Sequence, residues 1–383
     1  MKAQRLVWAL NRLPRFGIQT FKRLQEKQLD LSQCGDSELV NLLADFDPNF
    51  PQEFTQILSS GEFESDLEQC HQAGIRMMSL LDSDYPTNLA AIYDPPLILY
   101  IKGSFIPEDR YSIAVVGSRH PSTYGIRMAG KFSSELSVRG ITIVSGFARG
   151  IDAEAHRSSL RTKGRTIAVL GCGLDVIYPK EHASLYQEII EHGAIVSEFP
   201  LGTTPEAYNF PKRNRIITGL SMGVLVVEAN QRSGSLITAS IAAEEGREVY
   251  AIPGQIDSVT AQGTNRLIQT GAKLVSCAED ILVDLHDQLK ALSKNRHCEE
   301  AKRPTKQSRT EIASLTSFTR NDEITNSILK LLTNEPLSLD DIMIGLGGVP
   351  KDISSRLAQL EVQGVIKRVF GGQYVRTSST AIT

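Results

Sequence analysis

Residues 112–119 read Ser-Ile-Ala-Val-Val-Gly-Ser-Arg, and they establish the architecture of the central part of the chain. A near-continuous run of branched apolar residues is typical of a parallel strand that helices cover on both faces. Comparable runs, separated by helical stretches, occur at 141–145, 166–170, 194–197, 223–227, 248–252 and 273–276. This alternation implies right-handed crossovers, so the sequence predicts an α/β fold with a doubly wound, mostly parallel sheet.

The segment from Tyr85 to Tyr100 precedes this sheet and contains Pro86, Pro95 and Pro96. Proline lacks a backbone donor and disfavours helical conformation in the residue before it. We therefore expect extended or edge structure here rather than helix. The α/β domain as a whole is predicted to span residues 73–285.

Residues 1–72 are predicted to form an all-helical domain. Leu6, Trp8, Ala9 and Leu13 follow helical spacing, and the turn Leu-Pro-Arg-Phe-Gly-Ile at 13–18 separates this helix from the next. Such a turn could be a helix-hairpin-helix motif that cradles a phosphate, or part of a small helical bundle that only packs. We favour the packing interpretation.

The C-terminal part divides into a polar segment and a second ordered region. Residues 286–322 lose apolar periodicity and are polar and slightly basic, so we expect a linker. Residues 323–383 show three helical patterns and then two apolar runs, 365–369 and 373–375, around Gly371-Gly372. Three helices followed by a hairpin are typical of a winged helix. Because its charges balance, DNA binding and protein docking are both open for this domain.

The composition is that of an ordinary globular protein of 383 residues, with 41% hydrophobic residues and a formal net charge of -3. A histone-like polycation is excluded, so any affinity for nucleic acid must come from a local patch. The five cysteines are odd in number and show no metal-binding spacing, which fits a reducing compartment. No apolar run approaches the length of a membrane span, and we expect a cytoplasmic protein.

Small, flexible turns follow four of the predicted strands. They are Gly117-Ser118-Arg119, the turn 146–152, the turn 171–175, and the turn that begins with Ser233-Gly234-Ser235. Glycine lets backbone amides approach an anion closely, and open parallel sheets bind ligands beyond the carboxyl ends of their strands. Together the four turns indicate a phosphate-binding edge. Neither a GxGxxG fingerprint nor a Walker motif is present, so the edge lacks the signature of a dinucleotide or P-loop site.

Cations and aromatic rings are interleaved along the same edge. Phe147 lies two residues before Arg149, and the stretch Phe-Pro-Lys-Arg-Asn-Arg at 210–215 opens a predicted helix. Helix N-termini offer unpaired N–H donors and a favourable dipole to anions. Rings stack on any base and cations neutralise the backbone, so the pattern favours single-stranded nucleic acid over a mononucleotide. Core packing is the alternative for these rings, and we favour it for Phe147.

Candidate catalytic groups are few. His156 could act as a general base oriented by Asp152, Cys172 stands between two glycines, and Glu228 ends a predicted strand. The alternatives are a packed histidine, a small buried thiol, and a carboxylate that pairs with nearby arginines. Since the sequence places no base beside a nucleophile, we assign no catalytic residue.

Several motifs, in order along residues 80–275, resemble the DNA processing protein A (DprA/Smf) family. They are Ala114-Val-Val-Gly-Ser-Arg119, Ser145-Gly-Phe-Ala-Arg-Gly-Ile-Asp152, Gly173-Leu-Asp175 with Tyr178-Pro179, Phe210-Pro-Lys-Arg-Asn-Arg-Ile-Ile217, Ser233-Gly-Ser-Leu-Ile-Thr-Ala239 and Ala251-Ile-Pro-Gly254. The resemblance implies an extended Rossmann-like domain without nucleotide chemistry. It also implies a SAM-like helical domain before this domain and a winged helix after it.

The resemblance further implies a function and a site. Members of the family bind and protect single-stranded DNA, dimerise, and load the RecA recombinase onto it in natural transformation; here we expect a homodimer through the Rossmann-like domain. Arg119 and Lys212 are implied as phosphate contacts. The nucleic-acid-binding residues expected on this basis are Ser118, Arg119, Gly146, Phe147, Arg149, Phe210, Lys212, Arg213, Asn214, Arg215, Ser233, Gly234 and Ser235. No cofactor, metal or catalytic residue is implied.

Two alternative functions are left open. Lysine-decarboxylase-like phosphoribohydrolases share a similar layout, but their Pro-Gly-Gly-x-Gly-Thr-x-x-Glu loop needs a glutamate three residues after its threonine. The corresponding position after Thr238 is Ile241, and the adjacent glycine pair is missing. A winged-helix transcription factor is the other alternative, and it would prefer duplex DNA over single strands.

Overall fold

The structure is a computed structural model that describes residues 2–27 and 34–285, and further on residues 331, 342, 357, 360, 366–369 and 373–376. The chain divides into two compact units, residues 1–302 and 303–383. The linker predicted at 286–322, and most of the helical residues predicted after 323, lie outside the described residues.

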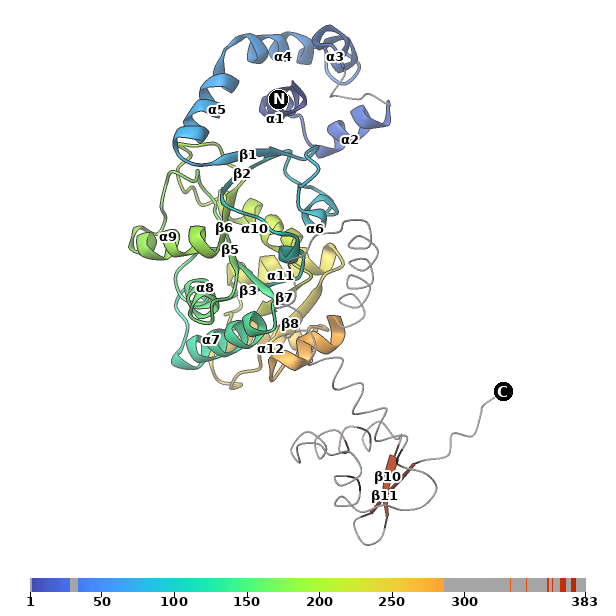
Figure 1. The fold of residues 1–383 in the computed structure, drawn as a ribbon, viewed down its shortest axis with the longest axis vertical. Helices are drawn as coiled ribbons and strands as arrows, with labels where there is room; N and C mark the ends of the chain where they lie inside the picture. Colours follow the sequence, from blue (N-terminus) through green and yellow to red (C-terminus); the bar gives the residue numbers. More distant parts are fainter. Residues whose placement is uncertain are drawn as a thin grey trace, which may run out of the picture. The chain divides into compact units, whose positions relative to one another are not determined.

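A single sheet runs through the first unit (Figure 1). Its strands are β1 (Arg76–Ser79), β2 (Ile98–Gly103), β3 (Ser112–Val116), β4 (Thr142–Ser145), β5 (Thr166–Val169), β6 (Gly193–Ser197), β7 (Gly223–Val226), β8 (Glu248–Ala251) and β9 (Lys273–Leu274). They lie in the order β1-β2-β6-β5-β4-β3-β7-β8-β9. From β3 the chain therefore moves outward to β6 and then returns to place β7 on the other side of β3.

The seven predicted parallel strands, β3 to β9, are confirmed, and they pair parallel to one another throughout. The residues of β3 to β7 are all buried, as strands covered on both faces must be. β1 and β2 add an antiparallel edge next to β6. The expectation for residues 85–100 was only partly right, because Thr87–Ala90 forms a short helix, α6, directly after Pro86. Proline is tolerated at that position because its missing N–H would have no helical partner there.

Helices cover the two faces of the sheet. On one side α8 (Ile151–Arg161) and α9 (Ala183–His192) pack beside α7 (Thr123–Val138), and their apolar side chains meet Ala168 and Ile195 of the sheet. On the other side α10 (Asn209–Leu220), α11 (Gly234–Glu244) and α12 (Gln262–Gln269) pack against Ile167, Val169 and their neighbours. Successive strand residues thus face opposite layers.

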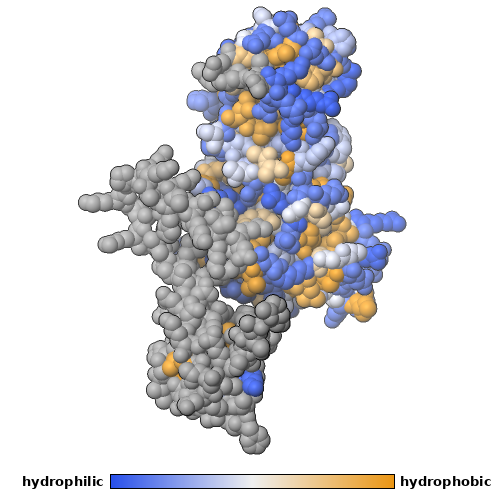
Figure 2. All heavy atoms as spheres, turned by 90° about the vertical axis from the view of Figure 1, so that its right-hand side faces the viewer, coloured by the Kyte–Doolittle hydropathy of each residue, from blue (hydrophilic) through white to orange (hydrophobic). Residues whose placement is uncertain are grey.

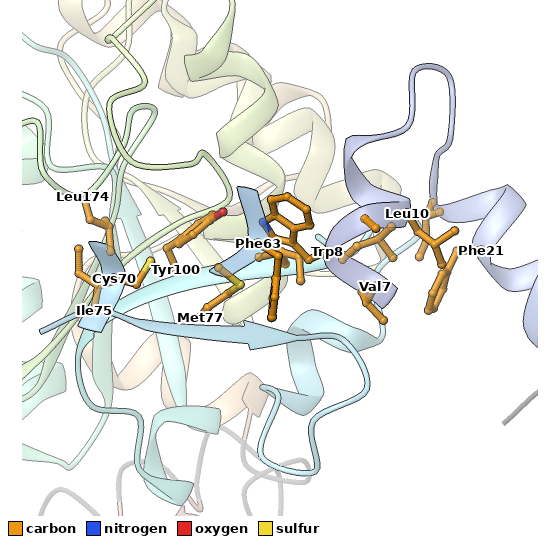
Figure 3. Close-up of a cluster of buried hydrophobic side chains, with 14 of the residues drawn as sticks. Val7, Trp8, Leu10, Phe21, Phe63, Cys70, Ile75, Met77, Tyr100 and Leu174 are labelled. Atoms are coloured by element: carbon orange, nitrogen blue, oxygen red, sulfur yellow. The ribbon is translucent and has the colours of Figure 1, made fainter. Parts of the chain in front are cut away.

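The N-terminal helices do not form a core separate from the sheet. They are α1 (Lys2–Arg12), α2 (Ile18–Glu26), α3 (Asp36–Leu43), α4 (Phe50–Ser59) and α5 (Glu62–Gln72). Figure 3 shows a continuous row of side chains from Phe21 and Trp8 through Met77 and Tyr100 to Leu174 beyond the sheet edge. The sequence predicted a separate domain at 1–72, whereas these buried side chains belong to one cluster with those of the sheet.

The turn between α1 and α2 is held by contacts within the protein. Arg15, at φ 66°, places its guanidinium 3.2 Å from the Asp47 carboxylate, and the Lys22 ammonium donates to the carbonyl of Tyr93 at 3.1 Å. These two cations are therefore engaged within the protein, in line with the packing interpretation of the turn.

In the second unit, β10 (Ile366–Val369) and β11 (Gln373–Arg376) pair antiparallel, with Ile366 opposite Arg376. This confirms the predicted hairpin around Gly371-Gly372. Within the described residues, no helix combines the length and the hydrophobicity that crossing a membrane requires.

The shared core makes a prediction about Trp8, which is 1% exposed, packs edge-on against Phe63 and donates its indole N–H to Asp66 at 3.1 Å. Trp8→Ala is expected to lower the free energy of unfolding by about 3–5 kcal/mol, because it leaves a large cavity. Hydrogen exchange at rising denaturant should then show lower protection in β2 and β5 as well as in α1 to α5. Trp8→Phe, which keeps a ring in place, is the control. Loss of protection confined to residues 2–72 would contradict a shared core.

Candidate nucleic-acid interface

Four turns meet at the carboxyl edge of the parallel strands, and the first two interlock through their backbones. The Ser118 amide, after β3, donates to the carbonyl of Glu228, after β7, at 2.8 Å. The Ser118 carbonyl accepts from the Ile151 amide at 3.1 Å, where α8 begins. Gly150 has φ 77°, and a Cβ there would lie 2.4 Å from the Ser118 oxygen. The turn after β3 is thus held from both sides, at the point where the strand order reverses and open sheets bind ligands.

Arg213 lies in the middle of this edge and is 4% exposed. Its guanidinium donates to the carbonyl of Gly146 at 2.7 Å and to the carbonyl of Val169. The Arg213 side chain thereby links the ends of β4 and β5. The Asp152 carboxylate, also buried, accepts from the amides of Gly146 and Ala148 at 3.1 and 3.3 Å. Burial lowers the pKa of Arg213 to about 10 and raises the pKa of Asp152. The positive charge of Arg213 and the negative charge of Asp152 each reduce the pKa shift that burial causes in the other residue. Arg213 is a structural cation, so the expectation that it binds DNA directly is corrected.

The two residues that follow Arg213 are also engaged inside the protein. Asn214 is buried and accepts from the Arg213 side chain at 3.3 Å. Arg215 donates to Asp94 at 2.9 Å and to Glu198 at 2.6 Å, with 18% of its side chain exposed. These contacts fasten α10 to the end of β6 and to the loop before β2. Asn214 and Arg215 therefore support the position of α10 rather than reach out from it.

The first turn of α10 presents a different set of side chains. The Phe210 ring lies against Gly171, where a Cβ would approach its Cδ1 to 3.0 Å. The exposed Arg119 guanidinium sits 5.2 Å from the centre of the Phe210 ring, and the Tyr178 ring lies 6.0 Å from it. Arg119 and Phe210 come from turns more than 90 residues apart, so the fold brings together a cation and a ring as the sequence predicted for this edge.

Lys212 is exposed, and its ammonium lies 5.5 Å from the centre of the Tyr208 ring. Tyr208 is 64% exposed and Tyr178 is 40% exposed. Sequence reasoning did not select either tyrosine as a site residue, although Tyr178 belongs to a motif that it quoted and Tyr208 lies two residues before another. We call Ser118, Arg119, Tyr178, Tyr208, Phe210 and Lys212 the Arg119–Lys212 rim.

The turn after β4 contributes less to this surface than expected. Phe147 is 1% exposed and packs edge-on against the rings of His182 and Tyr186, at centroid distances of 5.2 and 6.1 Å. It is a core residue, which confirms the packing interpretation favoured from the sequence and corrects its inclusion among the nucleic-acid-binding residues implied by the resemblance. Gly146 is buried, and a Cβ there would collide with Arg213 and Asp152 at 2.7 Å. Arg149 does reach the surface, where it forms an ion pair with Glu181.

The turn after β7 caps a helix. The Ser233 hydroxyl accepts from the Ser235 amide at 3.4 Å and contacts the Ser235 hydroxyl at 2.8 Å, at the start of α11. Ser235 is buried, whereas Gly234 is exposed, and a Cβ added to it would meet no atom within 4 Å. The turn leaves Gly234 as its surface position at a helix N-terminus.

The candidate catalytic groups are packed within the protein. His156 is fully buried, its Nδ1 lies 2.6 Å from the Thr166 hydroxyl, and burial lowers its pKa to about 3. Burial raises the pKa of the Cys172 thiol to about 11, which keeps it protonated and unreactive. Asp152 is committed to backbone amides, as described above, and Glu228 accepts from hydroxyl and amide donors rather than from arginines. The geometry does not assemble these groups into a catalytic dyad.

Comparison with known proteins identifies the family. The sequence model described as DNA recombination-mediator protein A matches residues 76–286, more than half of the chain. This chain belongs to that family. A second model, described as the DprA winged helix domain, matches residues 307–372 and so begins inside the segment predicted as a linker.

Individual relatives agree with this assignment. Protein Smf of Escherichia coli is 43% identical over 298 residues, which cover 76% of this chain and 75% of the relative. The crystal structure of DprA from Streptococcus pneumoniae matches with a TM-score of 0.63 and 36% identity, over 73% of this chain and 97% of that one. A structure of DprA from Helicobacter pylori, whose subject is its single-stranded DNA binding mode, matches with a TM-score of 0.51 and 29% identity, over 56% of this chain and 96% of that one.

The different environments of Arg213 and Arg119 predict opposite results on substitution. Arg213→Gln is expected to lower the free energy of unfolding by roughly 3–5 kcal/mol, because Asp152 and two carbonyls lose a buried cation. Arg119→Gln, the exposed counterpart, should change it by less than about 0.5 kcal/mol. Urea denaturation of both variants tests this. A stable Arg213→Gln variant that had lost only its affinity for DNA would contradict the structural role and show that Arg213 contacts DNA.

Proposed function

We propose that this protein binds single-stranded DNA without sequence preference at the Arg119–Lys212 rim. We further propose that it protects the strand and loads the RecA recombinase onto it during DNA recombination and natural transformation. The observation that carries the proposal is the placement of two exposed cations, Arg119 and Lys212, beside the rings of Phe210 and Tyr208 at one sheet edge. The single-stranded DNA binding mode studied in the Helicobacter pylori relative supports it.

The rim suits a flexible single strand on physical grounds. Each cation that neutralises a phosphate releases counterions, which supplies affinity that does not depend on sequence. Each accessible ring can stack on a base and contributes about 1–3 kcal/mol. Because the formal net charge of the chain is -3, attraction to DNA has to come from such local cations rather than from the protein as a whole.

The anion-binding half of the rim is a helix N-terminus with exposed residues. α10 begins at Asn209, so the positive end of its dipole lies at the turn that carries Lys212; the Asn209 amide itself donates to the Glu206 carbonyl at 3.0 Å, and Pro211 has no N–H. Arg119 approaches the same turn from the loop after β3. A phosphate placed between these cations would therefore meet charge from two separate elements, which favours a backbone contact over base recognition.

Substitution of the two cations tests the proposed strand binding. Lys212→Gln and Arg119→Gln should each weaken binding to a mixed-sequence oligonucleotide. Each should also flatten the slope of log affinity against log salt by about 0.7, the value for one phosphate on a single strand. Fluorescence anisotropy at several salt concentrations measures both quantities. In the same variants, assembly of RecA on strands covered by single-strand-binding protein should slow in proportion to the lost affinity.

Lys163→Gln is the matched control, because this exposed lysine follows the far end of α8, away from the rim. It should leave affinity and slope unchanged. Equal losses in all three variants, or tighter binding to duplex than to single strands, would contradict the proposal. The second outcome would favour recognition of duplex DNA by the winged helix.

A homodimer through the Rossmann-like domain is part of the proposal, and the sheet edge at β9 supports it. Leu274 on this terminal strand is 48% exposed, and Val259 and Val283 on the flanking segments are 63% and 56% exposed. Figure 2 shows hydrophobic side chains in several patches on the lower part of the first unit, which carries α12 and the later strands. An exposed apolar side chain on a terminal strand leaves the sheet edge open to pairing with a second copy.

Leu274→Arg is expected to shift the protein from dimer to monomer in sedimentation velocity, since it places a charge in an apolar contact. Val138→Arg, at the exposed C-terminal end of α7, should leave the dimer intact. A dimer that survives Leu274→Arg, or a monomeric unmodified protein, would contradict an interface at β9.

A further inference from the structure

Glu228, two residues after β7, is 3% exposed, and its side chain bridges two elements. Its carboxylate accepts from the amide and the hydroxyl of Ser122, at 2.8 and 2.5 Å, just before α7 begins. It also accepts from the Thr260 hydroxyl at 3.1 Å, before α12. The proposed function gives this buried side chain no role.

The backbone of Glu228 holds the other end of the same loop. Its carbonyl accepts from the Ser118 amide at 2.8 Å, while its carboxylate accepts from Ser122. Arg119 lies between these two anchors, in a segment of only five residues. One residue therefore fixes both ends of the loop that carries a proposed phosphate contact.

The fit at the start of α7 is close. A Cβ on Gly125 would lie 2.3 Å from the Glu228 carboxylate, so this position accepts only glycine while the carboxylate is seated there. The Gly125 amide donates to the Ser122 hydroxyl at 3.1 Å, which links the carboxylate to the first turn of the helix. In dinucleotide-binding folds a ligand phosphate sits at the N-terminus of the helix that follows the first strand. Here a protein carboxylate accepts from the Ser122 amide at that position, and Arg119 lies on the same loop three residues earlier.

We propose that Glu228 is a positioning residue for strand binding: it sets the loop 118–122 so that Arg119 projects over Phe210, and does not itself touch DNA. The inference rests on the proposed function. Its physical basis is preorganisation, since a loop held at both ends loses less conformational freedom when Arg119 closes on a phosphate. A residue that only stabilised the fold would affect every contact of the rim equally, whereas Glu228 acts through Arg119.

A double-mutant cycle in the full chain tests the inference. Glu228→Gln keeps the length of the side chain but cannot accept from all three donors. It should weaken binding to a mixed-sequence single strand by roughly 3- to 10-fold, as expected for the loss of a buried hydrogen bond. Combined with Arg119→Gln it should cause no further loss, and combined with Lys212→Gln the two losses should multiply.

Two further variants keep the test decisive if Glu228→Gln folds poorly. Ser122→Ala removes the hydroxyl bond to Glu228 from the loop side and keeps the backbone amide bond, so it should cause a smaller loss that also depends on Arg119. Thr260→Val is the matched control. It removes a hydrogen bond to the same carboxylate, but Thr260 is not part of the loop that carries Arg119. Hydrogen exchange of residues 118–125 should rise in Ser122→Ala and Glu228→Gln, and stay unchanged in Thr260→Val.

Losses that multiply with both Arg119→Gln and Lys212→Gln would overturn the positioning role, and so would faster exchange in the loop without loss of affinity. These outcomes differ from failure of the proposed function, which would appear as weak or absent strand binding by the unmodified chain. Absence of strand binding by the unmodified chain would therefore contradict the inference about Glu228 as well as the proposed function.

Discussion

The buried guanidinium of Arg213 is the contact on which the carboxyl edge of the sheet depends. It reaches from α10 to the carbonyls that end β4 and β5, opposite the Asp152 carboxylate. A cation removed from water is costly unless hydrogen bonds and an opposite charge offset the loss of hydration. Because Arg213 finds these partners in a single geometry, the first turn of α10 can dock in only one orientation. The rest of the surface follows from that orientation.

Neighbouring residues in this turn consequently have opposite roles. Arg213 faces the strands and Arg215 is tied to Asp94 and Glu198, while Lys212 faces solvent beside Tyr208. At this sheet edge the buried cations are paired with carboxylates and carbonyls, whereas the positive charge of Lys212 is exposed to solvent. The loop that carries Arg119 is held by a second buried acid, Glu228, and by the Ile151 amide at the start of α8. Such preorganisation suits a site that recognises backbone charge rather than bases.

The sequence was sufficient for the sheet because each parallel strand is an uninterrupted apolar run with a glycine turn behind it. It also placed the start of α10 and the hairpin around Gly371-Gly372. It could not assign roles within Phe210–Arg215, because three cations within four residues cannot be told apart until it is known which face of the helix packs on the sheet. One signal was available: Arg213 precedes Ile216, Ile217 and Leu220 by three, four and seven residues, the spacing of a buried stripe. The sequence favoured core packing for Phe147, and the structure agrees. Nothing local joins helices 1–72 to the sheet, since those contacts are distant in sequence.

Photo-crosslinking of a single-stranded oligonucleotide substituted with 5-bromouracil tests the central claim most directly. If the strand lies on the Arg119–Lys212 rim, mass spectrometry should find the crosslinks in peptides that contain Tyr178, Tyr208 or Phe210, and Lys212→Gln should reduce them. Crosslinks confined to residues 2–72 or to the winged helix, with none on these aromatic residues, would contradict the account.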